Sequence, residues 1–475
     1  MNQPNESSLK WYQGITNYQW LVLVIASLGW VFDVFEGQIF VASMRDAMPA
    51  LLDGVEADND RVLRWNNIAF GFFLLGGAVG GVFFGVVSDR IGRSKTMVLT
   101  ILFYSVFTCV SAFAQAPWQM VLLRFLVAMG VGGEWAVASA MVAEVMPTRS
   151  RPMMGSIFHA SSVFGTLLAA ATVALLIGNE AVNTRIADMG VQPWRIGFAI
   201  GVLPALLTVW IRWKLREPES WERAQQRAAE DATQKPGRIS ELFSSENLRS
   251  TTVGVTLAMI GLVTFWGIHI YGKNALLRRA QADALAIEQV VPPGPEASDE
   301  EKAEFDASKK VAFATHSSEI KRSEMLSMVL NTIGGGLGLL LFGAISNRIG
   351  RKGAFVFYHI TAFVCVLVLF KVLLPLDASP LVLAIFLPIF GFFTLGMHAG
   401  YAVYFPELYP TRIRGTGTGF CFNSGRLGTA AAFFMFGFLI SITPEQQALW
   451  LSPLYLAGAI VVLFGRETRG MELLE

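Results

Sequence analysis

Apolar residues gather along the chain into twelve blocks, separated by polar stretches that are mostly short. A helix needs about 20 apolar residues to cross the ~30 Å hydrocarbon layer of a membrane, and each block has about that length. The pattern therefore predicts an all-α membrane protein with twelve transmembrane helices. The predicted spans cover residues 19–41, 68–88, 97–114, 118–144, 153–178, 195–213, 251–272, 324–346, 354–375, 380–405, 416–441 and 447–465.

Composition supports this interpretation and narrows the chemistry. The chain is 53% hydrophobic and only 15% charged, whereas a soluble domain carries roughly 25% charged residues. Its net charge of +1 gives no reason to expect a nucleic-acid partner. The sequence contains no Gly-x-Ser-x-Gly, His-Glu-x-x-His or Cys/His cluster. We therefore expect neither an enzyme, nor a metal site, nor a cofactor.

Two longer polar segments divide the chain. Residues 214–250 mix both charges and are interpreted as a cytoplasmic linker between an N-terminal half, 1–213, and a C-terminal half, 251–475. Residues 273–323 form an outer insert in the second half, with a helix-like start and a proline break at VVPPGPE. We favour a solvated helical cap for this insert, and a substrate-binding lid is the alternative.

Basic residues follow the even-numbered spans, and this bias predicts the orientation of the chain. Ten lysines and arginines lie in those short loops, whereas the loops after spans three, nine and eleven carry one at most. Basic loops stay in the cytoplasm. Both termini are therefore expected in the cytoplasm, and the chain is expected to be a multi-pass protein of the cell's inner membrane.

The two halves repeat short phrases at matching places. GVVSDRIGRSKT, from Gly85, returns as GAISNRIGRKGA, from Gly343, with six of the first nine letters shared. EVMPTRSR, from Glu144, returns as ELYPTRIR, from Glu407, with five matches in eight positions. Repeated six-span halves related by an axis along the membrane normal are a known design of transporters.

On these phrases the chain resembles the major facilitator superfamily. The carrying residues are Gly85, Asp89, Arg90, Gly92, Arg93 and Lys95, with a second copy at Gly343, Asn347, Arg348, Gly350, Arg351 and Lys352. RFLVAMGVGGEW in span four and GRETRGMELLE at the C-terminus are similar to metabolite:proton symporters, including carriers of sialate, aromatic acids and monocarboxylates. The likeness covers nearly all of the chain outside the insert. It implies alternating access coupled to protons.

The repeated phrases also predict a cytoplasmic gate. Basic loops that face acids at helix ends can hold two halves together through charge-assisted hydrogen bonds and then release them. The alternative is that the basic residues serve only to orient the chain. The predicted gate residues are Asp89, Arg90, Arg93, Glu144, Arg151, Arg348, Arg351, Glu407 and Arg414.

Ionisable residues inside the spans predict the site of proton coupling, since charge within a membrane is costly and marks a pathway. Asp33 in span one and Arg124 in span four are both expected ~20 Å above the inner face, which predicts that they pair. A carboxylate beside a cation holds its charge, and the same group buried alone favours its protonated form. Glu36 is the alternative proton site and Glu134 the next, while a static ion pair is the alternative role.

Arg426 in span eleven predicts the substrate site, because a cation near the midplane requires an anionic partner. The partner is either a protein carboxylate or the substrate, and we favour a substrate carboxylate. Asn423 lies one turn away on the same face. Trp135, Trp266 and His269 are further expected substrate contacts, although aromatic and histidine residues in spans also serve as ordinary core.

Together these features predict a secondary active transporter that moves a small polar metabolite with protons, acting as a monomer in the lipid bilayer. The metabolite is expected to bear a carboxylate, of sialate, aromatic-acid or monocarboxylate type. A sugar:proton symporter, a facilitative uniporter and a transport-like substrate sensor are the alternatives.

Overall fold

The computed structural model describes residues 10–475 apart from 57–58, 173–174, 176–179, 295–296 and 438–442, and the regular elements of this part are helices. The N-terminal half contains α1 (Asn17–Leu51), α2 (Asp60–Ile91), α3 (Arg93–Ser111), α4 (Pro117–Val145), α5 (Arg151–Ala160), α6 (Ser162–Thr172), α7 (Glu180–Asp188), α8 (Pro193–Ile200) and α9 (Ala205–Lys214). The linker contains α10 (Glu219–Glu230), η3 (Ala232–Gln234) and η4 (Ile239–Phe243). The C-terminal half contains α11 (Leu248–Thr264), η5 (Phe265–His269), α12 (Ile270–Gly272), α13 (Ala275–Ile287), α14 (Asp299–Thr315), α15 (Ser317–Leu367), η6 (Val368–Leu373), α16 (Pro380–Gly396), α17 (Ala399–Glu407), η7 (Thr411–Ile413), α18 (Arg414–Gly437), α19 (Pro444–Leu451) and α20 (Pro453–Leu463).

These helices account for the twelve predicted spans. Among the described residues, nine helical stretches are long and apolar enough to cross a membrane. One of them, Ser317–Leu373, contains both the eighth and the ninth span, and these two spans meet at a non-helical turn at Gly350. The shorter Pro193–Leu207 corresponds to the sixth span, and α18 to the eleventh. The fold is therefore that of an all-α membrane protein with twelve membrane spans in two halves of six.

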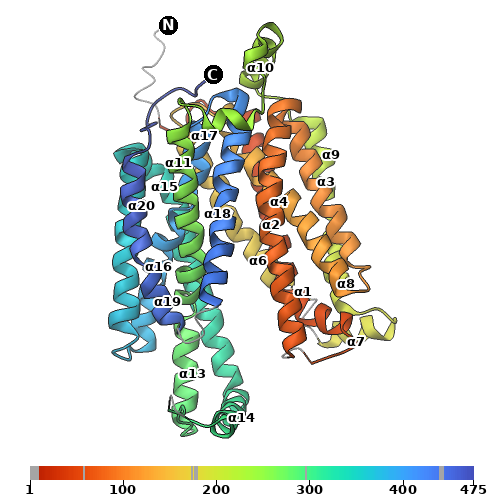
Figure 1. Cartoon of the computed structure of the whole chain (residues 1–475), viewed down its shortest axis with the longest axis vertical. Helices are drawn as coiled ribbons and strands as arrows, with labels where there is room; N and C mark the ends of the chain where they lie inside the picture. Colours follow the sequence, from red (N-terminus) through yellow and green to blue (C-terminus); the bar gives the residue numbers. More distant parts are fainter. Residues whose placement is uncertain (1–9, 57–58, 173–174, 176–179, 295–296, 438–442) are drawn as a thin grey trace.

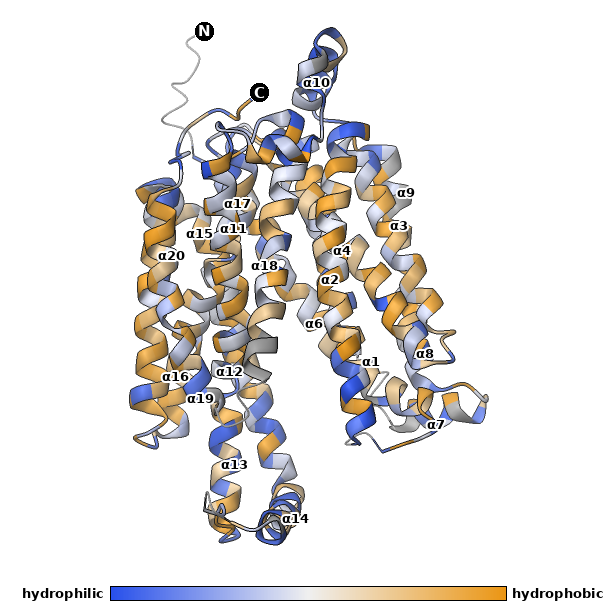
Figure 2. Cartoon of the chain, in the orientation of Figure 1, coloured by the Kyte–Doolittle hydropathy of each residue, from blue (hydrophilic) through white to orange (hydrophobic). Residues whose placement is uncertain are grey.

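The two halves stand side by side in Figure 1, with the C-terminal half in green and blue and the N-terminal half in red and orange. The chain's C-terminus and α10 lie at one end of the bundle, here called the terminal end. Helices α7, α13 and α14 lie at the opposite end, here called the insert end. Figure 2 shows apolar residues along the bundle and polar residues concentrated towards its ends, as a protein that crosses a lipid layer requires.

The halves meet along a few pairs of helices. Helix α2 packs against α18, α5 packs against α15 and α17, and α4 packs against α17 and α18. Close approach depends on glycine at several points: a Cβ on Gly85 would lie 2.6 Å from the carbonyl oxygen of Gly415, and one on Gly343 would lie 2.5 Å from that of Pro152. Small residues let helix backbones approach in this way.

Each half uses the same glycine turn after its second helix. Gly92 and Gly350 have φ values of 114° and 85°, a region that side-chain-bearing residues rarely adopt. A carboxylate caps the N-terminus of the helix that follows each turn. The backbone N–H of Arg93 donates to Glu217 at 2.5 Å, and that of Arg351 donates to Glu467 at 2.9 Å. The internal repeat is thus visible in backbone geometry and in helix capping.

Most of the described residues in the insert 273–323 lie in helices, and the insert belongs to the C-terminal half. Helix α13 packs against α14, α15 and α16. Its Arg278 forms an ion pair with Glu445 of α19, and Arg279 forms one with Asp377. A cavity of about 140 Å³ lies between these ion pairs. The insert is therefore fastened to one half at the insert end of the bundle.

Candidate functional site

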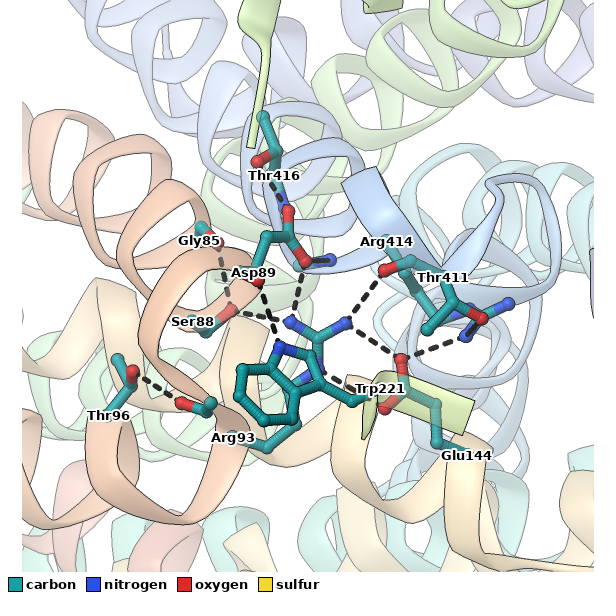
Figure 3. Close-up of polar contacts among 12 residues, drawn as sticks. Gly85, Ser88, Asp89, Arg93, Thr96, Glu144, Trp221, Thr411, Arg414 and Thr416 are labelled. Atoms are coloured by element: carbon teal, nitrogen blue, oxygen red, sulfur yellow. Dashed lines mark hydrogen bonds and ion pairs between the residues drawn. The ribbon is translucent and has the colours of Figure 1, made fainter. Parts of the chain in front are cut away.

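Arg93 is the centre of a buried ion network at the terminal end of the bundle (Figure 3). Its guanidinium contacts Asp89 at 2.6 Å and Glu144 at 2.8 Å, and these side chains are fully buried. Glu144 in turn contacts Arg414, the first residue of α18, at 2.8 Å. Since Glu144 belongs to the N-terminal half and Arg414 to the C-terminal half, this carboxylate joins the two halves.

Asp89 makes a second link between the halves. Its carboxylate accepts hydrogen bonds from the backbone N–H groups of Gly415 and Thr416, at 3.0 and 2.8 Å, and from the Thr416 hydroxyl at 2.6 Å. These N–H groups lie in the first turn of α18, where a helix has no acceptors of its own. A carboxylate there also interacts favourably with the helix dipole. The end of α2 therefore caps a helix of the opposite half.

The second copy of the phrases does not reproduce these links. Arg351 contacts Glu407 at 2.8 Å, but both residues belong to the C-terminal half. Arg151, the repeat partner of Arg414, donates to the carbonyl oxygen of Ala143 at 3.0 Å, and among the described residues it forms no ion pair with Glu407. Asn347, which stands where the first copy has Asp89, is uncharged, and its side-chain amide donates to the carbonyl oxygen of Arg149 in the other half at 3.5 Å. The ionic contacts between the halves at the terminal end are consequently asymmetric.

Arg90 and Arg348 do not join this network. Both residues are exposed. Arg90 donates to the carbonyl oxygen of Gly237 at 3.5 Å, and Arg348 makes no side-chain hydrogen bond or ion pair within the described part of the chain. Their positions suit the alternative role, which is to orient the chain in the membrane.

The C-terminal tail and the linker make further contacts at the same end of the bundle, and neither was predicted to contribute to the gate. The Leu474 carbonyl oxygen accepts from the Thr411 N–H at 3.1 Å and from Arg414 at 2.7 Å. Glu475 pairs with Arg227 and Arg223 of α10, and the hydrogen bond from Arg227 is the main reason that the pKa of Glu475 lies below its usual range. Glu217 and Glu467, which cap the helices after the two glycine turns, could have been found from the sequence. Each follows the last span of a half, in REPES and in GRETRG.

Within the spans, Arg124 pairs with Glu36 and not with Asp33, which corrects the predicted pairing. The Arg124 guanidinium contacts the Glu36 carboxylate at 2.6 Å and also donates to Ser111. Thr108 donates to the same Glu36 oxygen at 3.1 Å. Helix α1 runs to Leu51, well beyond the predicted end of span one. Arg124 therefore lies level with Glu36, about one helical turn further along α1 than Asp33.

We expect Glu36→Ala to lower the free energy of unfolding by about 3–5 kcal/mol, because it leaves the Arg124 charge buried without a partner. Thermal unfolding of the detergent-purified protein measures this loss. The double variant Glu36→Leu/Arg124→Met removes both charges and should recover most of the lost stability. Unfolding of Glu36→Ala at the wild-type temperature would show that the pair does not support the fold.

Asp33 and Glu134 form an acidic pair of sites beside this ion pair. Asp33 is 1% exposed, and neither of its carboxylate oxygens has a hydrogen-bond partner among the described residues. Glu134 is fully buried and accepts from Thr100 at 2.6 Å. It lies against α1 one turn from Asp33, since a Cβ on Gly29 would be 2.6 Å from its Oε1. Asp33 is within electrostatic range of Glu134, Glu36 and Arg426.

Arg426 and Asn423 lie side by side on α18, facing α2 of the other half. Arg426 is twelve residues into the helix, which places it ~18 Å from the terminal end and close to the midplane. Its Nη1 is buried and has no partner in the part of the chain that the structure describes. Asn423 is fully buried, and its Nδ2 donates to the carbonyl oxygens of Gly132 and Gly419, at 3.3 and 3.0 Å. Its Oδ1 has no partner within the described residues.

The three aromatic residues predicted to contact substrate lie in different surroundings. Trp135 stacks on Phe422 across the two halves, with ring centroids 3.7 Å apart. Trp266 makes an edge contact with Phe70, also across the halves, at 5.5 Å. His269 is buried in the C-terminal half, where Thr394 and Asn331 hydrogen-bond its two ring nitrogens at 2.8 and 3.2 Å. This is the arrangement of a core histidine.

Fold and site together define a class of protein. A membrane transporter of this design has apolar helices in two halves. Here a buried ion network links the halves at one end, and ionisable residues lie between them. The chain belongs to the sugar (and other) transporter family, whose model matches residues 21–264 and 303–475, and it is a transporter of the major facilitator superfamily. Among the described residues, no group of three His, Cys, Asp or Glu side chains is arranged to hold a metal ion.

Relatives of known name are transporters of small molecules. The chain is 28% identical to the cis,cis-muconate transport protein of Acinetobacter baylyi, over 78% of this chain and 77% of that protein. It is 25% identical to the sialic acid transporter NanX of Escherichia coli, over 97% of each. The proton:xylose symporter XylE, solved with 6-bromo-6-deoxy-D-glucose, shares its fold with a TM-score of 0.70 and 16% identity, over 96% of this chain and 98% of XylE.

Proposed function

We propose that this transporter carries a small organic acid, together with protons, across the cell's inner membrane. The observation that carries the proposal is the buried Nη1 of Arg426, which lacks a partner among the described residues near the midplane, where the two halves meet. A charge that is buried without a partner is costly, and an anion beside it removes much of that cost. A substrate carboxylate supplies that anion in bidentate geometry. The muconate and sialic acid named for the relatives are both carboxylates.

Asp33 is the proposed proton site. It lies on the N-terminal half and within electrostatic range of Arg426 on the C-terminal half. An ionised Asp33 competes with the substrate carboxylate for the Arg426 cation, and its negative charge repels that carboxylate. A protonated Asp33 leaves Arg426 to the substrate. Glu134 on α4, Glu36 on α1 and Tyr104 on α3 are the other ionisable groups that face Asp33, and the first two disfavour its charge.

The proposed cycle uses residues 1–213 and 251–475 as two moving halves joined by the linker 214–250, in a monomer. The links made by Glu144 and Asp89 hold the halves together at the terminal end. With both termini in the cytoplasm, this conformation is closed toward the cytoplasm. Inward opening must break these links, and proton and substrate binding at the midplane supply the free energy that shifts the equilibrium between the two states.

Proteoliposome uptake tests the proposed function. An inward proton gradient is expected to drive accumulation of at least one of cis,cis-muconate, N-acetylneuraminate and benzoate, and to drive no accumulation of xylose. Arg426→Ala should abolish this uptake, with intact folding checked by thermal unfolding. Accumulation of xylose alone would favour a sugar symporter. Uptake of an acid that ignores the gradient would favour a uniporter, and binding without flux would favour a sensor.

Impermeant thiol labelling of intact cells tests the orientation. Single cysteines at Lys95 and Ala297, in a variant without native cysteines, should react oppositely: Ala297→Cys from outside, and Lys95→Cys only after the cells are broken. The expectation follows from the basic loops after the even spans. Reaction of both positions from outside would contradict the proposed orientation.

A further inference from the structure

The glycines of α2 fall into two sets that face different partners. Gly76 and Gly80 face α4 of their own half, where added Cβ atoms would lie 2.1 and 2.0 Å from backbone carbonyl oxygens. This is ordinary close packing of helices. Gly77 and Gly81 face α18 of the opposite half instead, and the atoms nearest to them belong to side chains.

These side chains are Arg426 and Asn423. A Cβ on Gly77 would lie 1.5 Å from Nη1 of Arg426, 2.7 Å from its Cζ and 3.2 Å from its Cδ. A Cβ on Gly81 would lie 1.8 Å from Nδ2 of Asn423. Even one methyl group at position 77 would therefore occupy the space of the guanidinium. The absent side chain of Gly77 allows Arg426 to reach across the boundary between the halves.

A second observation points to a ligand beside these glycines. Asn423 is fully buried, and its Nδ2 is held by two backbone carbonyl oxygens, which orients the amide. Its Oδ1 and the Nη1 of Arg426 are left without partners in the described structure. A buried donor and a buried acceptor one helical turn apart cost free energy unless something binds them.

We infer that Gly77 is a positioning residue for substrate binding: it seats the Arg426 guanidinium against α2 and so determines where the substrate carboxylate binds between the halves. That the bound group is a carboxylate rests on the proposed function. The position of the Arg426 guanidinium against Gly77, here called the seat, does not. A side chain at position 77 leaves the charge of Arg426 in place and moves it. Because the displaced atoms are the far end of a flexible side chain, the fold can accommodate the change.

A double-mutant cycle on affinity tests this inference, with cis,cis-muconate, N-acetylneuraminate and benzoate as probes. Gly77→Ala is expected to weaken binding roughly tenfold or more, the effect of losing one well-placed charge-assisted hydrogen bond. Adding Gly77→Ala to Arg426→Ala should weaken it no further, because both changes act on one guanidinium. Gly71→Ala on the same helix is the matched control, since an added Cβ there has no neighbour within 4 Å. Wild-type affinity in Gly77→Ala, or losses that simply add, would overturn the inference.

Two further measurements separate this inference from the proposed function. If no probe acid binds the wild type, the carboxylate assignment fails, and the seat is judged by the reaction of Arg426 with phenylglyoxal, read by mass spectrometry. Faster reaction in Gly77→Ala than in the wild type supports the seat, and equal rates refute it. If Gly77→Ala does not fold, Gly77→Ala/Arg426→Ala should fold, because the methyl enters vacated space. Failure of this double variant would show that Gly77 serves helix packing alone.

Discussion

Asp33→Asn is expected to abolish the accumulation of substrate driven by a proton gradient, while exchange of substrate between the two sides of the membrane persists. Asparagine keeps the shape of the aspartic acid and cannot release a proton. Asp33 is 1% exposed, and its carboxylate oxygens have no hydrogen-bond partner among the described residues. No hydrogen bond within that part of the chain therefore stabilises its ionised form. Uptake into proteoliposomes with and without an inward proton gradient, compared with counterflow at equal pH, measures the two activities separately.

Glu36→Gln and Glu134→Gln are the matched comparisons for this prediction. Glu36 is bound to Arg124 and Glu134 to Thr100, so each of these carboxylates already has a partner that Asp33 lacks. We expect both variants to retain gradient-driven accumulation if they fold. Accumulation that survives in Asp33→Asn and disappears in one of the other two would move the proton site to that residue.

Glu144→Gln is expected to slow transport roughly tenfold or more while substrate still binds. Its carboxylate accepts from Arg93 and Arg414 within the buried gate, and removing one partner of a buried ion pair costs about 3–5 kcal/mol. The loss falls on the state closed toward the cytoplasm, because only that state holds Glu144 and Arg414 together. The population therefore shifts toward inward opening, and the return step of the cycle becomes unfavourable.

Glu407→Gln is the control, since it occupies the repeat position of Glu144. Glu407 contacts Arg351 and Thr468, which both belong to its own half. Loss of the Glu407 carboxylate should lower the stability of the fold. It should leave the equilibrium between the inward-open and outward-open states nearly unchanged. Initial transport rates and binding affinities of the two variants separate these effects. Wild-type rates in both variants would mean that the repeated phrases serve orientation only, and equal losses would contradict the asymmetry of the gate.

Much of the gate was accessible from the sequence because its residues recur at fixed places beside the ends of spans. Asp89, Arg93, Glu144 and Arg414 were predicted as gate residues, and they lie in one buried network. The sequence did not show which of these contacts join the two halves, because the two copies of a phrase differ by single residues such as Asn347. The contribution of the tail was missed for another reason: Leu474 acts through its backbone carbonyl, which any residue could provide.

The sequence by itself determined the twelve spans and the two-half architecture. The thickness of the hydrocarbon layer sets the length of an apolar block, and that length can be read without knowing any contact. Only the tertiary structure decided that Arg124 pairs with Glu36 and that Gly77 faces Arg426 of the opposite half. Such contacts depend on the rotation and depth of each helix, which packing against its neighbours determines. One turn of helix is about 5.4 Å, so a boundary error of a few residues exceeds the ~3 Å reach of a hydrogen bond.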